Sequence, residues 1–333
     1  MAGQIGFTLM TEQSGPRELV RYARLAEESG FDYLVSSDHY FPWLPEMGHS
    51  PYAWSLLGAV SQVTERVGLM TYVTCPTMRY HPAVVAQKAA TVGLLSEGRF
   101  VLGLGAGENL NEHVVGPGWP RVSTRHEMLA EAIDVIRRLL DGETVTHHGD
   151  HFTVDAARLW DRPEGRLKVG VAVSGDRSVD RFGSAADHLI AVQPDAGLVQ
   201  RWREQREQAS LPAGRAIGQL PICWGPDADR CAQRAHELFR WFSSGWPVMA
   251  ELPLPGSFTA ASESVTVDEV AQGIPCGPDL DAVVEALEPW WDAGFTDVAL
   301  VQVGDESQEQ FLREAAPELL GRVRERPTFR AVA

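Results

Sequence analysis

The chain has 333 residues, of which 44% are hydrophobic and 22% are charged, as is usual for a folded protein with a large core. Its formal net charge of −16 argues against sequence-independent binding to nucleic acid and against an anionic membrane surface, because both need clustered Lys and Arg. No apolar run is long enough to span a bilayer, and the first residues lack the pattern of a secretory signal. We therefore expect a cytoplasmic protein that binds a small molecule.

Short apolar runs alternate with longer amphipathic runs from the start of the chain. In the first 140 residues four such pairs predict a strand followed by a helix. The predicted strands cover residues 4–10, 33–35, 67–73 and 99–104, and the predicted helices cover residues 16–29, 52–64, 83–95 and 125–140.

Four more strand-like runs follow in the second half, each before a helical pattern, at residues 167–173, 188–192, 218–224 and 298–303. Eight strands in alternation with helices predict a (β/α)8 TIM barrel that residues 1–333 form as a single domain. A doubly wound open sheet is the alternative, because the sequence alone does not reveal closure.

Two segments interrupt this alternation and predict insertions near residues 141–166 and 243–270. Residues 144–154 carry Gly149-Asp150 between β-prone runs, which predicts a hairpin. Residues 243–264 are rich in Pro, Gly and Ser, which predicts a long loop over one end of the barrel. Such loops commonly cover active sites.

Polar and aromatic side chains follow the second predicted strand. The run SSDHYFPW at residues 36–43 places a carboxylate, an imidazole and an indole, those of Asp38, His39 and Trp43, just beyond the apolar residues. Barrel enzymes carry their chemistry at the carboxyl ends of the strands. A lone His there is more often a packing or surface residue, but beside an acid and a Trp an imidazole suits proton transfer.

A second cluster, GLGAGENLNE at residues 103–112, follows the fourth predicted strand. Glu108 comes after three glycines, and a carboxylate is costly to bury in a core. A dinucleotide-binding fingerprint belongs on the first strand-to-helix turn and has its last Gly one position later, so we do not expect a nicotinamide site. The two clusters together predict a cofactor pocket surrounded by acid and base groups.

Other residues give weaker signals. The four cysteines, Cys75, Cys223, Cys231 and Cys276, lack the spacing of a zinc site or a disulfide framework, so we expect reduced thiols. The run HHGDH at residues 147–151 falls in the predicted hairpin turn, where neighbouring side chains diverge, and we predict no metal site. The sequence contains neither a nucleotide-binding P-loop nor a Gly-x-Ser-x-Gly element.

The chain resembles the deazaflavin-dependent branch of the luciferase-like oxidoreductases, and most closely the coenzyme F420-dependent glucose-6-phosphate dehydrogenase group. The resemblance spans nearly the whole chain and is carried by short motifs in a fixed order, namely TEQ at 11–13, PRELV at 16–20, SDH at 37–39 with PW at 42–43, CPTMRYHPAV at 75–84 and GENLNE at 107–112. It implies coenzyme F420 as the cofactor and a homodimer, which the apolar, Trp-rich run around Trp290-Trp291 also favours.

The resemblance also implies roles for four residues. The His that matches His39 takes the hydroxyl proton while the substrate carbon gives hydride to the deazaflavin. The Trp that matches Trp43 lies against the reacting centre and excludes water. The Glu that matches Glu108 serves the ring nitrogen that gains a proton, and Glu12 matches a further carboxylate that orients the imidazole or the substrate.

Further residues are implied to hold the cofactor. The Tyr72-Val73 peptide matches a non-proline cis bond that supports the ring. Residues 174–178, SGDRS, open a helix and offer backbone N–H groups and a guanidinium to an anionic tail, although a plain helix cap is the alternative. Arg79 is a second candidate anion contact. The full set of cofactor-binding candidates is Asp38, Tyr72, Val73, Cys75, Gly105, Ala106, Gly107, Asn111, Val173, Ser174, Gly175, Arg177 and Gln193.

The substrate pocket departs from the resemblance. The glucose-6-phosphate enzymes bind the sugar phosphate with basic side chains from three segments, and here these segments read Asp195, Gln272 and Glu309. A carboxylate beside a phosphate repels it. We therefore expect glucose 6-phosphate to be a poor substrate and a neutral polyol or a cationic amino sugar to be favoured.

The predicted reaction is hydride transfer between a carbinol or carbonyl carbon and C5 of the deazaflavin. Four alternatives stay open at this point. They are a redox-neutral F420-dependent epimerase, a reductase that uses the reduced deazaflavin, an FMN-dependent monooxygenase of the same superfamily, and a non-catalytic deazaflavin-binding protein.

Overall fold

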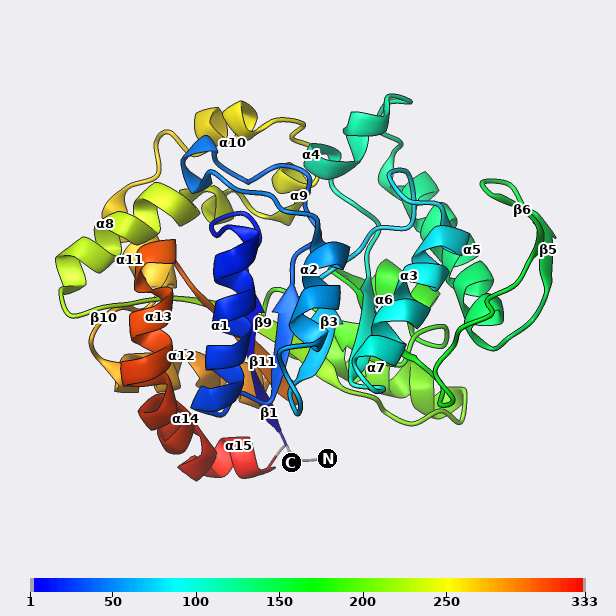
Figure 1. Cartoon of the computed structure of the whole chain (residues 1–333). Coiled ribbons are helices and arrows are strands. Elements are labelled where there is room, and N and C mark those ends of the chain that lie inside the picture. The colour runs from blue at the N-terminus through cyan, green and yellow to red at the C-terminus, as the bar shows by residue number, and fades with distance from the viewer. Residues whose placement is uncertain (1–2, 332–333) are drawn as a thin grey trace.

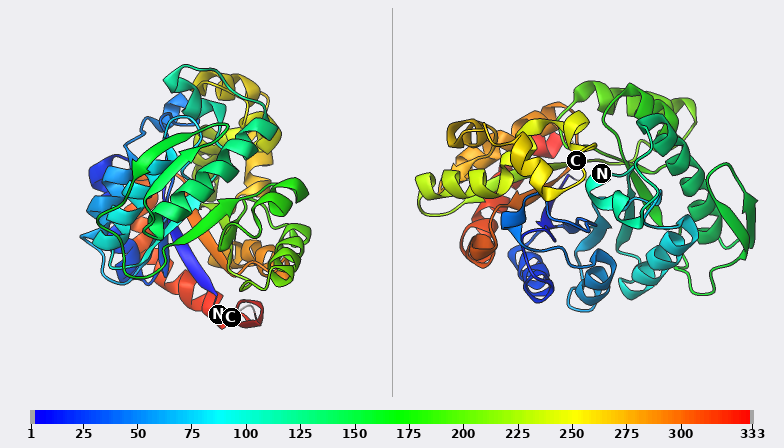
Figure 2. Two further views of the ribbon diagram at one scale, coloured as in Figure 1. Left: turned by 90° about the vertical axis from the view of Figure 1, so that its right-hand side faces the viewer. Right: turned by 90° about the horizontal axis from the view of Figure 1, so that it is seen from above.

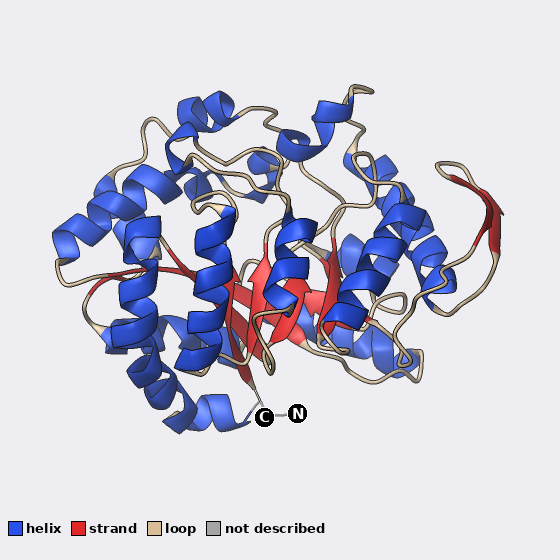
Figure 3. Cartoon of the chain, in the orientation of Figure 1, coloured by secondary structure: helices blue, strands red, loops and turns tan. Residues whose placement is uncertain are grey.

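Eight parallel strands form the centre of the computed structural model, which describes residues 3–331 (Figures 1 and 3). They are β1 (Gln4–Leu9), β2 (Tyr33–Ser36), β3 (Gly68–Thr71), β4 (Phe100–Leu104), β7 (Lys168–Ala172), β8 (His188–Ile190), β9 (Ala216–Trp224) and β11 (Asp297–Gln302). Each pairs with the next, and β11 pairs with β1, where Gln4 lies opposite Asp297. The sheet is therefore closed, and the predicted (β/α)8 barrel is confirmed.

Helices surround this barrel, as the view from above in Figure 2 shows. The longer ones are α1 (Pro16–Ser29), α2 (Ala53–Ser61), α3 (Pro82–Leu95), α5 (Val122–Leu140), α7 (Ala196–Gln208), α8 (Ala228–Phe239), α12 (Leu280–Asp292) and α14 (Ala316–Glu325). Helix α1 shows how the sequence determines where a helix starts and ends. Pro16 occupies the first turn of α1, and Gly30 ends the helix in the left-handed region, with φ of 98°.

Shorter elements complete the chain. They are the helices α4 (Asn109–Glu112), α6 (Asp176–Phe182), α9 (Trp246–Met249), α10 (Pro255–Ala261), α11 (Val267–Gly273), α13 (Gln308–Gln310) and α15 (Pro327–Ala331), the 3-10 turns η1 (Pro45–Met47), η2 (His113–Val115), η3 (Arg240–Ser244) and η4 (Asp305–Ser307), and the π-helical turn η5 (Phe311–Ala315). None of the helices in residues 3–331 has the length and apolar character needed to cross a membrane.

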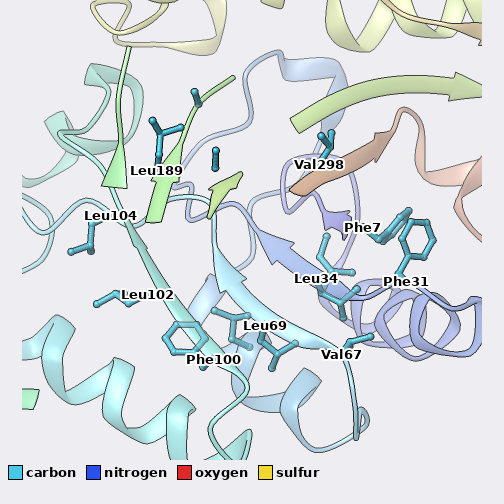
Figure 4. Packing of buried hydrophobic residues seen from close by; sticks show 14 of the residues in the cluster. Phe7, Phe31, Leu34, Val67, Leu69, Phe100, Leu102, Leu104, Leu189 and Val298 are labelled. Carbon is cyan, nitrogen blue, oxygen red and sulfur yellow. The ribbon is translucent and has the colours of Figure 1, made fainter. Parts of the chain in front are cut away.

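Alternation along each strand divides the core into two layers. Tyr33 and Val35 of β2 point into the barrel, whereas Leu34 between them packs in the layer between strands and helices. Figure 4 shows part of this outer layer around Leu34, Phe7 and Phe100. The outer layer holds the helices on the barrel and leaves the strand ends free to carry polar side chains.

The first insertion forms the predicted hairpin. Strands β5 (Val145–His148) and β6 (Thr153–Ala157) pair in antiparallel fashion and project from the side of the barrel beyond α5 (Figure 1). His147 Nε2 lies 2.9 Å from Glu131 Oε1 on α5, so this histidine already has a partner. Among residues 3–331, no group of three His, Cys, Asp or Glu side chains is placed to hold a metal ion.

The second insertion differs from the prediction. Residues 243–264 are not a long loop, because the 3-10 turn η3 and the short helices α9 and α10 occupy most of them. The buried side chains of Met249 and Phe258 in this segment, and of Trp241 just before it, stabilise these helices. Pro255 stands at the first turn of α10, where proline favours a helix. We call residues 240–261 the roof, since they lie over one end of the barrel (Figure 1).

The two neighbouring tryptophans of α12 lie inside the protomer. Trp290 is 3% exposed and packs against Phe295, and Trp291 is 4% exposed and packs against Phe329. Their burial within one chain means that they do not argue for a dimer, which stays a prediction from the family resemblance.

Candidate active site

A cavity opens at the carboxyl ends of the barrel strands, beneath the roof. The cavity and its mouth together contain about 1240 Å³ of space between atoms, part of which is open to solvent. Segments after six of the strands contribute to its wall, through residues such as Glu12, His39, Tyr72, Gly107, Ser174 and Val192. The roof contributes Trp241, Phe242, Trp246 and Met249. The end of the barrel that carries this cavity is the one where barrel enzymes act.

His39 lies at the centre of the polar part of this cavity. Its Nδ1 lies 3.1 Å from the carbonyl oxygen of Phe41 and 3.3 Å from Glu12 Oε1. A carbonyl oxygen only accepts hydrogen bonds, so Nδ1 carries a proton in this geometry. In the neutral ring Nε2 is then the acceptor, and it lies 3.4 Å from Glu108 Oε2.

Glu12 is held against this imidazole by two hydroxyl groups. Its Oε2 accepts hydrogen bonds from Ser37 Oγ at 2.5 Å and from Thr11 Oγ1 at 3.1 Å, while Oε1 faces His39. The side chain of Glu12 is 1% exposed. A carboxylate fixed in this way stabilises a positive charge on the neighbouring ring.

Glu108 lies on the opposite edge of the imidazole, at the cavity wall. Burial raises the pKa of Glu108, and the charge of Glu12 raises it further, whereas His39 and a hydrogen bond from Asn111 lower it. Asn111 Nδ2 donates this bond to Oε2 at 2.9 Å, and Asn111 Oδ1 accepts from the backbone N–H of Tyr40 at 2.8 Å. The same amide therefore positions both Glu108 and the segment that carries the histidine.

Trp43 forms the aromatic side of the site. Its ring centroid lies 4.8 Å from that of His39, and it stacks on Trp241 of the roof at 4.2 Å with an interplanar angle of 7°. Phe258 meets it edge-on at 5.2 Å. The indole thus joins the imidazole to the roof and keeps this part of the cavity apolar.

A buried ionic cluster lies behind the strand ends. Arg79 Nη2 is 3.1 Å from Asp38 Oδ1, and Arg79 Nε is 3.5 Å from Glu112 Oε1. Asp38 Oδ2 also accepts from Trp54 Nε1 at 3.1 Å and from Thr74 Oγ1 at 2.6 Å. Both carboxylates are fully buried. The cluster fixes the start of the segment that carries the histidine.

The cluster makes stability depend on pH through Glu112. Burial raises the pKa of Glu112 from its ordinary 4.5 to about 7, although Arg79 lowers it. A carboxyl whose pKa is raised on folding contributes stability below the unfolded pKa and loses that contribution as the pH rises through the folded value. From pH 5 to pH 8 we expect the free energy of unfolding of wild type to fall by on the order of 3 kcal/mol relative to Glu112→Gln. Urea unfolding of both proteins at the two pH values measures this, and parallel pH profiles would contradict it.

Eight of the thirteen cofactor-binding candidates line the cavity. They are Tyr72, Val73, Cys75, Gly105, Ala106, Gly107, Val173 and Ser174. The peptide bond between Tyr72 and Val73 is cis. Gly105 is needed for packing, since a Cβ there would lie 2.6 Å from Val73 Cγ2. Burial raises the pKa of the Cys75 thiol well above its ordinary value, so it stays protonated.

The other five candidates lie outside the cavity lining. The carboxylate of Asp38 is held in the ionic cluster, and Asn111 contacts Glu108 rather than the cavity. Gly175 and Arg177 line a separate surface groove at the start of α6, which shares Ser174 with the cavity and also carries Asp176, Asp180 and Arg181. Gln193 is exposed after β8.

The three residues predicted to bind substrate do not reach the cavity. Asp195 caps α7, where its Oδ1 accepts from Leu198 N at 3.1 Å. Gln272 is exposed on α11. Glu309 lies on α13, where Arg21 is 3.2 Å away and Arg313 is 3.0 Å away. The structure therefore does not bring them together: Asp195 caps its own helix, and Glu309 pairs with arginines of α1 and η5.

Several cavity residues were not expected from the sequence. The roof aromatics Trp241, Phe242 and Trp246 are the largest group, together with His126 of α5 and Gln219 inside the barrel. The density of aromatic residues in 239–246 is a signal that could have indicated a packed wall. No local sequence pattern marks His126 or Gln219 as a cavity residue, since each lies within a regular helix or strand.

Comparisons with known proteins agree with this geometry. A family model described as luciferase-like monooxygenase matches residues 2–297. The F420-dependent glucose-6-phosphate dehydrogenase of Microbacterium testaceum is 34% identical over 335 aligned residues, which cover 97% of this chain and 98% of that protein. The F420-dependent hydroxymycolic acid dehydrogenase of Mycobacterium tuberculosis is 35% identical over 299, which cover 87% of this chain and 80% of that protein.

A solved structure supports the same family relationship. An F420-dependent secondary alcohol dehydrogenase in complex with an F420-acetone adduct superposes with a TM-score of 0.89 at 28% identity, over 98% of this chain and all of that one. The match extends over the whole barrel and both insertions. The chain therefore belongs to the luciferase-like family, in which its relatives include F420-dependent dehydrogenases.

Proposed function

We propose that the protein is a coenzyme F420-dependent oxidoreductase that transfers hydride between a carbinol or carbonyl carbon of its substrate and C5 of the deazaflavin. The relatives described above are F420-dependent dehydrogenases by name. The observation that carries the proposal is the imidazole of His39, which stands in the cavity between Glu12 and Glu108.

The cavity fits a planar cofactor ring. Small and apolar groups at strand ends, among them Val73, Ala106, Ala172 and Ala191, contribute to its lining and leave room for an aromatic ring. Glu108, a carboxyl whose pKa is raised by burial, stands at the cavity wall. When bound, coenzyme F420 supplies the carbon that accepts or returns hydride. Ser174 links this wall to the groove at α6, which would take the anionic tail.

His39 is suited to move the substrate's hydroxyl proton. Its Nδ1 proton is held by Phe41 O, so Nε2 can accept a proton from a hydroxyl in the cavity. The imidazolium formed in this way is stabilised by Glu12 at 3.3 Å. In the reverse direction the same Nε2 returns the proton to a carbonyl oxygen.

Glu108 is suited to hold or give a second proton. Its raised pKa keeps more of the protonated carboxyl near neutral pH than an exposed glutamate would have. Within residues 3–331, the polar contacts of its Oε2 are those with Asn111 Nδ2 and His39 Nε2. The group therefore has capacity to serve a ring nitrogen of a bound cofactor.

The cavity supports an uncharged substrate. Within the described residues that line it, no Lys or Arg is present, so a sugar phosphate would find no cation there. An amino sugar loses its expected partners, because Asp195 and Glu309 lie elsewhere. Trp43 and the roof aromatics instead favour a carbinol of low polarity, with a neutral polyol as the second candidate.

Two measurements test the proposal. Titration with oxidised coenzyme F420 and, in parallel, with FMN is followed by fluorescence quenching, and we expect tight binding of F420 alone. Preference for FMN would replace the proposal by a flavin monooxygenase.

Turnover is then followed by loss of F420 absorbance with propan-2-ol, mannitol, glucosamine or glucose 6-phosphate, and we expect the uncharged alcohols to react fastest. Glucose 6-phosphate as the best substrate would contradict the assigned substrate class, and binding of F420 without turnover in either direction would support a storage protein.

A further inference from the structure

Three of the four cysteines meet at the base of the segment that carries the roof. Cys223 of β9 is the direct partner of Cys276 on the two-residue strand β10 (Cys276–Gly277), and its backbone N–H donates to Pro275 O at 2.8 Å. Cys231 lies on α8, which packs on both strands. Residues 224–275 leave the barrel after Cys223 and return to it at Cys276, which is why cysteines distant in sequence become neighbours.

A guanidinium stands among these thiols. Arg234 Nε lies 3.2 Å from Cys223 Sγ, and Arg234 Nη2 lies 3.5 Å from Cys231 Sγ. The same side chain is held in place by Trp224 O at 3.0 Å and by Glu306 at 3.2 Å. A fixed positive charge beside a thiol favours the thiolate, which is the reactive form of cysteine.

The two partnered cysteines differ in reactivity. The Cys276 thiol donates a hydrogen bond to Ile274 O at 3.2 Å. Interaction with the neighbouring Cys223 thiol lowers the pKa of Cys276, and Arg234 lowers it too, although burial and Cys231 raise it. Interaction with Cys276 and burial raise the pKa of Cys223. Cys276 is half-buried, whereas Cys223 is fully buried. Cys276 is therefore the thiol that a small oxidant would meet first, and Cys223 is the one placed to react second.

We propose that Cys223 and Cys276 form a reversible disulfide, with a hydroperoxide as the oxidant, which joins the two ends of residues 224–275. Directly paired residues on neighbouring strands lie about 4.8 Å apart, within the range of Cα separations that a disulfide spans. Both side chains leave the sheet on the same face, because their residues are register partners.

The reaction balances with the two thiols and one hydroperoxide. The Cys276 thiolate attacks a peroxide oxygen, the O–O bond breaks, and a sulfenic acid forms while hydroxide leaves and takes up a proton as water. The Cys223 sulfur then attacks the sulfenic sulfur and gives up its proton, the S–O bond breaks, and a second water leaves. The two sulfurs lose two electrons in total and hydrogen peroxide gains them. A dithiol reverses the step by thiol–disulfide exchange.

The disulfide would restrict the roof. Residues 224–275 include Trp241, Phe242 and Trp246, which line the cavity. With both ends of this segment joined covalently, openings that separate β10 from β9 are suppressed. The proposed site does not depend on the identity of the cofactor, because it is formed only by groups outside the cavity.

Mass spectrometry of the full-length protein tests the proposal. Reduced protein should bind N-ethylmaleimide at all four cysteines after unfolding, and protein treated with hydrogen peroxide should bind it at two, with a linked peptide pair containing Cys223 and Cys276. Dithiothreitol should restore four. Cys276→Ser and Cys223→Ser should each prevent the loss of two thiols on oxidation. Cys231→Ser and Cys75→Ser should still lose two thiols on oxidation. Four free thiols after oxidation, or a bond that includes Cys231, would overturn the assignment.

Two further readouts follow from the same geometry. Hydrogen exchange of amides in residues 240–261 should slow on oxidation of wild type and stay unchanged in Cys276→Ser. Arg234→Gln should slow the reaction of Cys276 with peroxide severalfold, because the guanidinium is one of the groups that lower the pKa of this thiol. The matched control is Arg230→Gln, since Arg230 is exposed on the same helix and its side chain lines the same surface groove as Arg234. Equal rates for the two variants, or unchanged exchange in oxidised wild type, would contradict the proposal.

Discussion

Replacement of His39 by asparagine is expected to lower kcat for hydride transfer about 10²- to 10⁴-fold, because the hydroxyl proton then has no acceptor of suitable basicity. Asparagine keeps a polar group near Phe41 O and Glu12 but offers no titratable nitrogen. Binding of coenzyme F420 should change little, since the imidazole is one of many groups on the wall. The measurements are F420 turnover with the best alcohol from the substrate screen and a fluorescence titration of the cofactor.

The control for this prediction is another histidine. His148 is exposed on the hairpin, far from the cavity, and His148→Asn should retain full kcat. His39→Ala provides a second readout, because added imidazole should restore part of the rate if the side chain moves a proton. A purely structural His39 would predict loss of thermal stability in both variants and no rescue by imidazole. A kcat of His39→Asn near that of wild type would contradict the assigned role.

The alternation of strands and helices made the barrel predictable. Buried strands such as β2 and β11 are short apolar runs, and helices such as α1 have a proline at the first turn, so each element carries its own local signal. The roof did not carry such a signal. Its Pro, Gly and Ser content suggested a loop, whereas long-range packing of Trp241 and Phe258 makes it helical.

The sequence predicts which loops carry the polar site, but it does not predict in which direction each side chain points. His39 and Glu108 follow strands whose ends must meet at one edge of the barrel, so their proximity is a consequence of topology. Asp38 is adjacent to the histidine in sequence but turns away to Arg79, because a buried carboxylate needs a cation. The cysteine cluster depends on the return of residues 224–275 to the barrel, which no local pattern reveals.

Replacement of Arg79 by methionine is expected to lower the free energy of unfolding by about 3–5 kcal/mol, the usual cost of leaving buried charges without their partner. Asp38 and Glu112 are both fully buried and face this one guanidinium. Methionine fills a similar volume, so the loss of charge rather than a cavity would account for the effect. Urea unfolding at pH 8 measures it, because Glu112 is then mostly ionised at a pKa of about 7.

The comparison that isolates the buried charge is Arg66→Met. Arg66 also faces a carboxylate, Glu27, at 3.8 Å, but its side chain is 71% exposed. Exposed ion pairs contribute about 0.2–1 kcal/mol, so this variant should be nearly as stable as wild type. Adding Glu112→Gln to Arg79→Met should recover part of the lost stability, since it removes one of the two carboxylates that the first change leaves unpaired. Similar losses for the two arginine variants, or no recovery in the double variant, would mean that Arg79 acts by packing and not by compensating the buried carboxylates.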